Sequence, residues 1–285
     1  MSSAAAQKVR LSGAPNPFAD TSGQVLSKIW PPFRIALAQA VWGEAHIGPD
    51  TSEILFDCLP ILGLDPRMTV VEIGAGLGVL SRRMHLSGGV YCLGYEPDPA
   101  LIAAAIHRAA LDGFRRKTRF SEIDLHDPEF DELRPGSVDC WVVHNTMPLL
   151  HDPLPLIEQI VSYSSFGAQL LIADVFVTEI GDRAKSMRKW RAANTEVKGT
   201  VEWETVRDAL VAGGFEIHVQ ADASDEIRDA ISSAWNDYLS QVSTGEISVK
   251  SLPPALAEAQ RWMALRQALK TGGLEFRRVT ATKRG

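Results

Sequence analysis

The feature that most constrains the fold is an apolar segment that runs into three alternating glycines, residues 70–78 (V-V-E-I-G-A-G-L-G). Its β-branched residues Val70, Val71 and Ile73 predict a buried parallel strand. The glycines let the backbone turn tightly and approach a ligand closely, because they have no Cβ atom. A helix that begins near Val79 would aim its free N–H groups at the same place. The segment therefore predicts a strand, a ligand-binding turn and a helix.

Two details separate this turn from the fingerprint of dinucleotide-binding proteins. That fingerprint has its third glycine where this chain has Val79. In addition, Glu72 lies two residues before the first glycine, where a carboxylate would repel a pyrophosphate and attract an ammonium or sulfonium group. The pattern E-x-G-x-G-x-G resembles the first motif of the S-adenosylmethionine-dependent methyltransferases with a Rossmann-like fold (class I), in particular those that act on small molecules. An ordinary turn without a ligand is the alternative.

Strand-like and helix-like segments alternate from residue 69 onward, which predicts an α/β fold with helices on both faces of a parallel sheet. The resemblance implies a doubly wound sheet of seven mostly parallel strands, with the last strand antiparallel beside the fifth. We expect a flexible tail (1–22), an N-terminal helical cap (23–65) and a Rossmann-like domain (66–285). Two helices, 224–242 and 253–270, form a helical insertion at about 222–272 before the last strand.

Several local patterns support these boundaries. Ser224 is predicted to cap the first inserted helix, and Ile227, Ile231, Trp235 and Leu239 form its apolar stripe. Residues 50–53 resemble a capping box that opens a helix over 54–62, and apolar residues 26–37 lie at helical spacing. The segment 177–200 is polar and carries no predicted helix.

The resemblance also implies where the methyl donor binds. Its predicted contacts lie in the first motif, after the second and third strands, at the end of the fourth strand and at one aromatic residue before the core. They are Glu72, Gly74, Ala75, Gly76, Gly78, Glu96, Pro97, Asp124, Leu125, His144, Asn145 and Trp42. Glu96 lies about twenty residues after the turn, where an acid can accept both ribose hydroxyls. A solvated loop charge at Glu96 and a turn residue at Asp124 are the alternatives.

Candidate catalytic residues follow from strand ends, because ligands bind beyond the carboxyl ends of parallel strands. His144 ends the fourth strand and is the leading candidate for a general base, since histidine titrates near neutral pH. A structural histidine or a wall of the donor pocket is the rival interpretation. Asp174 ends the fifth strand and is the second candidate; a turn-capping acid is its rival. His151 is interpreted as a loop residue.

The segment 41–49 places an aromatic residue, two glycines, an acid and a histidine just before the core. Related small-molecule methyltransferases carry a stretch of this kind that closes over the methionine end of the donor. Trp42, Glu44 and His46 would line the pocket in that way. An inter-helix turn without a ligand is the alternative.

Composition narrows the function classes. The 285 residues carry a net charge of −6, which argues against a nucleic-acid partner. Its three cysteines are widely spaced and indicate buried thiols; no metal-ligand spacing is found, so no metal site is predicted. No apolar run is long enough to span a membrane, and a cytoplasmic location is expected.

The prediction is methyl transfer from S-adenosylmethionine, by in-line displacement, to an oxygen or nitrogen atom (carbon is a further option) of a small or medium organic acceptor. A homodimer is a possible assembly. The alternatives are a regulatory protein that binds S-adenosylmethionine without catalysis and, less favoured, an NAD(P)-dependent oxidoreductase.

Overall fold

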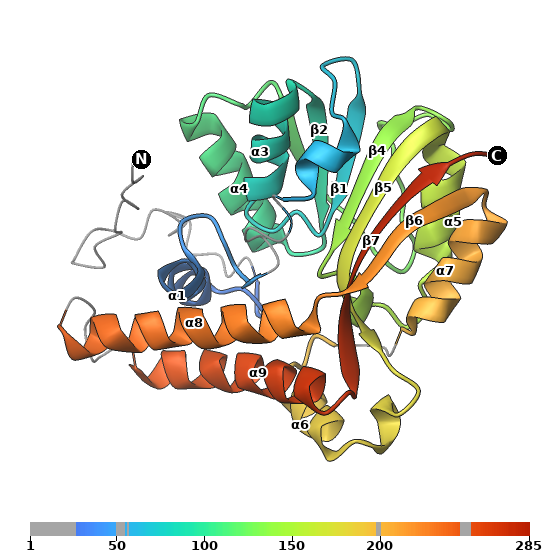
Figure 1. Cartoon of the computed structure of the whole chain (residues 1–285). Coiled ribbons are helices and arrows are strands. Elements are labelled where there is room, and N and C mark those ends of the chain that lie inside the picture. The colour runs from blue at the N-terminus through green and yellow to red at the C-terminus, as the bar shows by residue number, and fades with distance from the viewer. Residues whose placement is uncertain (1–26, 50–54, 56, 198–200, 246–251) are drawn as a thin grey trace, which may run out of the picture.

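A seven-stranded sheet forms the centre of the molecule (Figure 1). The computed structural model describes residues 27–49, 55, 57–197, 201–245 and 252–285. Its strand order is β3-β2-β1-β4-β5-β7-β6. The strands are β1 (Thr69–Ile73), β2 (Tyr91–Glu96), β3 (Thr118–Glu122), β4 (Val138–His144), β5 (Ser164–Val177), β6 (Phe215–Asp222) and β7 (Leu274–Lys283). Neighbouring strands are parallel except that β7 runs antiparallel to β5 and β6. The predicted doubly wound α/β fold is confirmed.

Helices cover both faces of the sheet, which explains why the central strands β1, β4 and β5 bury apolar side chains on both faces. Val70 packs with α3 (Val79–Gly88) on one face, and its neighbour Val71 packs with α5 (Leu154–Tyr163) and α7 (Trp203–Ala212) on the other. Cys140 and Trp141 of β4 alternate in the same way. The thiols of Cys58, Cys92 and Cys140 are buried, as predicted, and form no disulfide within the described residues.

Strand order reverses at β1, whose two neighbours are β2 and β4. The chain leaves β1 for α3 on one face, and it leaves β4 for α5 on the opposite face. This divergence opens a crevice beyond the carboxyl ends of the two strands, which is where ligands bind in open α/β sheets.

The helical insertion lies beside these strand ends (Figure 1). It consists of α8 (Ser224–Ser243) and α9 (Leu252–Lys270), which pack against each other and against α1 (Pro32–Trp42). The predicted cap at Ser224 is wrong, because its hydroxyl accepts a hydrogen bond from the Phe276 N–H instead. Within the predicted stripe Leu239 is half-exposed, and Tyr238 is buried in its place.

Within its described residues the N-terminal region contains α1 and a short 3-10 helix, Leu59–Leu62, at the end of the segment predicted as a helix over 54–62. Residues 54 and 56 of that prediction lie outside the described residues. Ile29 and Trp30 precede α1, since the prolines at 31 and 32 lack the N–H group that a helix interior requires. The predicted tail (1–22) and capping box (50–53) lie outside the described residues.

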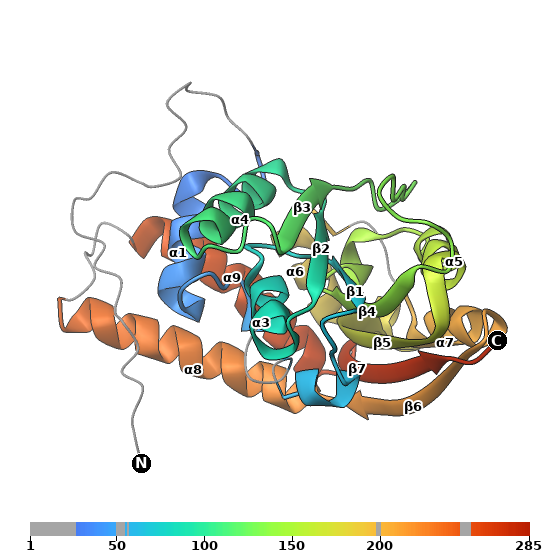
Figure 2. The same ribbon diagram turned by 90° about the horizontal axis from the view of Figure 1, so that it is seen from above.

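The segment 177–200, for which no helix was predicted, contains α6 (Lys185–Ala193). Two apolar residues, Met187 and Trp190, are buried, while Arg188 and Lys189 face solvent. So few apolar residues among charged ones give a weak periodic signal, which is why the helix was missed. α4 (Pro99–Leu111) completes the α3 face of the sheet, and Figure 2 shows both helices from above.

Candidate active site

The glycine turn is bent so that only glycine fits at its first position. Gly74, Gly76 and Gly78 all have positive φ (84°, 53° and 71°). A Cβ on Gly74 would lie 2.1 Å from the carbonyl oxygen of His144, so the turn presses against the end of β4. The N–H groups of Gly74 and Ala75 donate to the Tyr95 carbonyl at 2.9 and 3.1 Å. The turn thereby presents bare backbone to a cavity that it lines at residues 74–77.

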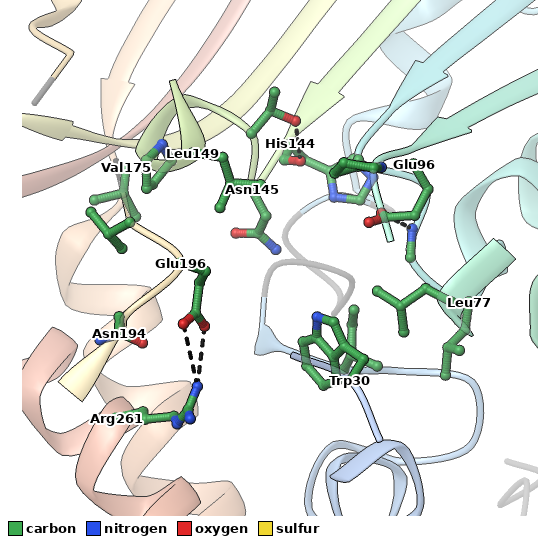
Figure 3. Close-up of a pocket in the computed structure, with 18 of the residues that line it drawn as sticks. Trp30, Leu77, Glu96, His144, Asn145, Leu149, Val175, Asn194, Glu196 and Arg261 are labelled. Atoms are coloured by element: carbon green, nitrogen blue, oxygen red, sulfur yellow. Dashed lines mark hydrogen bonds and ion pairs between the residues drawn. The ribbon is translucent and has the colours of Figure 1, made fainter. Parts of the chain in front are cut away.

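Glu96 ends β2 and faces this cavity (Figure 3). Its carboxylate accepts hydrogen bonds from the N–H groups of Gly76 (2.9 Å) and Asp98 (3.1 Å). The residue is only 7% exposed, and burial raises the pKa of its carboxyl to about 7 in spite of those two bonds. The neighbouring Pro97 lines the cavity as well. Both residues are predicted donor contacts, and Glu96 is the one for which the sequence predicts a ribose contact.

Asp124 and Leu125 follow β3 and line an adjoining cavity that shares Trp30, Glu96 and Pro97 with the first. Asp124 is exposed, and its Oδ1 accepts a hydrogen bond from the His126 N–H at 2.9 Å. Leu125 is buried. The predicted nucleoside contacts therefore lie around one continuous space at the ends of β1, β2 and β3.

Glu72 does not line either cavity, although the sequence predicts that it contacts the donor. It is fully buried, and its Oε1 lies 2.8 Å from His144 Nε2. Its other oxygen accepts a hydrogen bond from the Ser81 hydroxyl of α3. His144 does line the cavity, so Glu72 reaches the site only through the imidazole that it holds.

Asp174 is also placed away from the cavity, which contradicts its predicted catalytic position. It is fully buried and accepts hydrogen bonds from the N–H groups of Thr146 (2.7 Å), Met147 (2.9 Å) and Val175 (2.8 Å). Burial raises the pKa of its carboxyl to about 6. This geometry is that of a turn-capping acid, which holds the segment that follows β4.

That segment presents Asn145 to the cavity (Figure 3). Asn145 has a φ of 50°, a left-handed conformation that asparagine tolerates better than most residues. His151, on the later loop, stacks on His126 with ring centroids 5.8 Å apart and does not line either cavity.

The segment 41–49 contributes different residues from those predicted. Trp42 packs edge-on against Trp262, with ring centroids 4.8 Å apart, and is absent from the cavity lining. Glu44 forms an ion pair with Arg108, and His46 Nδ1 contacts the Glu44 carbonyl. Instead Ala45 and Ile47 line the cavity, together with Trp30 from the segment before α1.

The residues on the side of the cavity opposite the glycine turn were not among the predicted site residues. This side is built from α6, the segment that follows it, α9 and α1, and it includes Trp190, Asn194, Glu196, Glu258, Arg261, Trp262 and Arg34. None of these residues belongs to a motif. Their joint position depends on how helices distant in the sequence pack.

Two negative observations apply to the described part of the chain. It contains no group of three His, Cys, Asp or Glu side chains placed to hold a metal ion. Among its helices none combines the length and the hydropathy needed to cross a membrane.

Several solved structures with the same fold are methyltransferases. Phosphoethanolamine N-methyltransferase 2 of Haemonchus contortus, in complex with S-adenosyl-L-methionine, superposes with a TM-score of 0.75 at 16% identity, over 88% of this chain and 57% of that one. A putative sarcosine dimethylglycine methyltransferase from Galdieria sulphuraria gives 0.72 at 14% identity, over 88% and 98%. Geranyl diphosphate C-methyltransferase from Streptomyces coelicolor A3(2) gives 0.63 at 13% identity, over 81% of both chains.

These similarities show the fold, and this chain spans little more than half the length of the Haemonchus enzyme. No curated protein matches the sequence. A family model described as "Methyltransferase domain" matches residues 64–258, which is well over half of the chain and includes the glycine turn, β2 to β5 and part of α9. The chain therefore belongs to the methyltransferase domain family, as the resemblance of its first motif indicated.

Proposed function

We propose that this protein transfers a methyl group from S-adenosylmethionine to a small organic acceptor. The observation that supports this proposal best is the continuous space around the glycine turn, Glu96 and Asp124, which opens on its far side into a second wall of aromatic and charged residues. The structural neighbours bind S-adenosylmethionine or its demethylated product in the same fold. One half of the site suits a nucleoside, and the other half suits an acceptor.

The residues present fit the donor. Glu96, once ionised, can accept both ribose hydroxyls while it remains anchored to Gly76. Asp124 and Leu125 would hold the adenine in the adjoining cavity, and the glycine turn would lie against the amino-acid end. A side chain at Gly74 would collide with β4, so the fold requires glycine there. The turn therefore keeps a bare backbone that a ligand can approach closely.

When bound, the donor supplies a methyl group on a sulfonium, which is already an excellent leaving group. The chain must then orient the acceptor in line with that methyl group and exclude water. We assign water exclusion to Trp30 and Ile47, which line the cavity. His144 is retained as the candidate group that receives or positions the acceptor's proton, with Glu72 fixing its ring. Asp174 is assigned to holding the turn that presents Asn145.

Acceptors that react through oxygen or nitrogen remain the favoured class. A homodimer and the absence of a nucleic-acid partner stay predictions from the sequence. The regulatory alternative would require donor binding without turnover. The oxidoreductase alternative would require a nicotinamide dinucleotide in the same space, although Val79 and not glycine begins α3.

Calorimetric titration with S-adenosylmethionine, S-adenosylhomocysteine and NADH tests the donor. We expect the two sulfur nucleosides to bind and NADH not to bind. A screen of amine, phenol and carboxylic acid acceptors, read out as S-adenosylhomocysteine release, then tests turnover. Binding of NADH in preference to S-adenosylmethionine would contradict the proposal. Donor binding with no turnover on any acceptor class would favour the regulatory alternative.

A further inference from the structure

The acceptor half of the cavity combines aromatic walls with a cluster of four charged side chains. Trp190 of α6 and Trp262 of α9 supply apolar surface. The charged cluster consists of Arg34, Glu196, Glu258 and Arg261, which come from α1, from the segment after α6, and from α9. Because the two cations and the two anions cancel, the cluster as a whole does not select a charge. Selectivity for the acceptor must therefore come from those polar groups that have no hydrogen-bond partner within the protein.

Two members of the cluster are buried and already occupied. Arg34 Nε donates to Glu258 Oε2 at 2.9 Å, and Arg34 Nη1 donates to the Ile29 carbonyl at 2.8 Å. Glu258 Oε1 accepts from Arg34 Nη2 (3.3 Å) and from Trp262 Nε1 (3.1 Å). Both residues are at most 7% exposed. They form a frame that joins α1 to α9.

The other two members face the open part of the cavity (Figure 3). Arg261 Nη1 donates to both oxygens of Glu196, at 3.2 and 3.4 Å, and its Nε lies 3.8 Å from Glu258. Glu196 Oε1 also lies 3.5 Å from Arg34 Nη2, so each Glu196 oxygen has a cationic neighbour. Within the described residues, Arg261 Nη2 has no partner. The Nη2 amino group of Arg261 is therefore the donor that is left to bind a ligand.

We propose that the acceptor carries an anionic group, a carboxylate or a phosphate, which binds Arg261 Nη2 while the apolar body of the acceptor lies against Trp190 and Trp262. An N–H group of a guanidinium that donates to an oxyanion forms a charge-assisted hydrogen bond, which is stronger than one between neutral groups. Glu196 does not exclude the anion, because Arg34 and Arg261 already neutralise it. This inference rests on the proposed function, since it takes the opposite half of the cavity for the donor.

Indole derivatives that share the same aromatic body and differ in charge test the inference. We would saturate the protein with S-adenosylhomocysteine and titrate indole-3-acetate, its neutral analogue indole-3-acetamide, and indoxyl phosphate. We expect the anions to bind at least about tenfold more tightly than the amide, as charge-assisted hydrogen bonds imply. The preference between acetate and phosphate identifies which oxyanion the site takes.

Variants of α9 provide the control. Arg261→Met should abolish the preference for anions and leave the affinity for the amide nearly unchanged, while Arg261→Lys should retain part of the preference. The matched control is Arg266→Met on the same helix, because Arg266 donates to Ser232 and does not line this cavity. It should behave as the unmodified protein does.

Thermal melting confirms that each variant is folded. Equal binding of acetate and amide, absence of indole-3-acetate binding at millimolar concentration, or an unchanged preference in folded Arg261→Met would overturn the anion site. Failure of S-adenosylhomocysteine to bind would instead contradict the proposed function itself, so the two failures are distinguishable.

Discussion

Donor affinity should fall as the pH falls below 7, and Glu96 is the reason. Only the ionised carboxylate can accept both ribose hydroxyls, yet burial raises the pKa of this carboxyl to about 7 in the ligand-free protein. The N–H groups of Gly76 and Asp98, which favour the ionised form, offset this effect only in part. A protonated Glu96 must therefore lose its proton before the donor can bind.

The magnitude follows from that pKa. If only the ionised form binds, the apparent dissociation constant is about twofold above its plateau at pH 7 and about tenfold above it at pH 6. The same carboxyl makes folding pH-dependent. Its folded pKa, about 7, lies above the ordinary 4.5, so its contribution to stability is fully present below pH 4.5 and is lost as the pH rises through 7. The loss is about 3 kcal/mol, by the conversion of pKa shifts to free energy.

Calorimetry with S-adenosylhomocysteine at pH 6, 7 and 8, in two buffers of different ionisation enthalpy, measures both the affinity and the protons released. We expect release of about half a proton at pH 7 and little at pH 8. Glu96→Gln should bind weakly at every pH and release none. Glu204→Gln, an exposed acid on α7, serves as the control and should keep the full pH dependence.

A flat affinity between pH 6 and pH 8, with no proton release by the unmodified protein, would refute this reasoning. If the affinity of Glu96→Gln still depends on pH, the titrating group is a different residue. Asp174 is the buried alternative, because the pKa of its carboxyl is raised to about 6.

Three further predictions test the turn, the aromatic wall and the buried acid. Gly74→Ala should abolish donor binding and lower the unfolding free energy by more than about 2 kcal/mol, because its Cβ would lie 2.1 Å from a backbone carbonyl oxygen. Gly113→Ala is the control, because Gly113 has a similar φ of 79° and a Cβ there would meet nothing within 4 Å. It should lower the unfolding free energy by only about 1 kcal/mol, through backbone strain. Trp30→Ala should weaken S-adenosylhomocysteine binding measured by calorimetry, because Trp30 lines the cavity. Trp42→Ala should lower the melting temperature with little effect on that affinity, because Trp42 packs against Trp262. The reverse pattern would contradict the assignment of Trp30 to the cavity wall. Asp174→Asn should cost about 1–3 kcal/mol in denaturant unfolding, since a neutral amide replaces a carboxylate that accepts three backbone hydrogen bonds; an unchanged stability would argue for a role other than holding the turn.

Local sequence patterns predicted the elements that build the donor side. The β-branched run before Gly74 and the acid at the end of β2 each depend on residues only a few positions away along the chain, and in the structure the same holds for Asp98, the cap of α4. Asp98 accepts hydrogen bonds from the N–H groups of Ala100 and Leu101, as a helix cap does. Interactions over so short a range depend little on the rest of the fold, so they can be read along the chain.

The same patterns could not reveal what a buried carboxylate faces. Glu72 and Asp174 both lie inside strands near their carboxyl ends, Asp174 within β5 and not at its end as predicted, and an acid there can point either into the crevice or beneath it. The choice depends on neighbouring strands and turns, since His144 on β4 takes up Glu72 and the turn after β4 takes up Asp174. Desolvation then forces each acid to find hydrogen-bond donors below the cavity.

The sequence by itself determined the strand–turn–helix that cradles the donor, the order of elements around it and the acid that follows β2, because these rest on backbone freedom, hydrophobic periodicity and proximity along the chain. Only the tertiary structure decided the acceptor side. Arg34 and Glu258 lie 224 residues apart, and Trp30 faces the cavity while Trp42 turns away to Trp262. Such contacts arise from the way α1, α6 and α9 pack over the strand ends, and no local pattern encodes that packing.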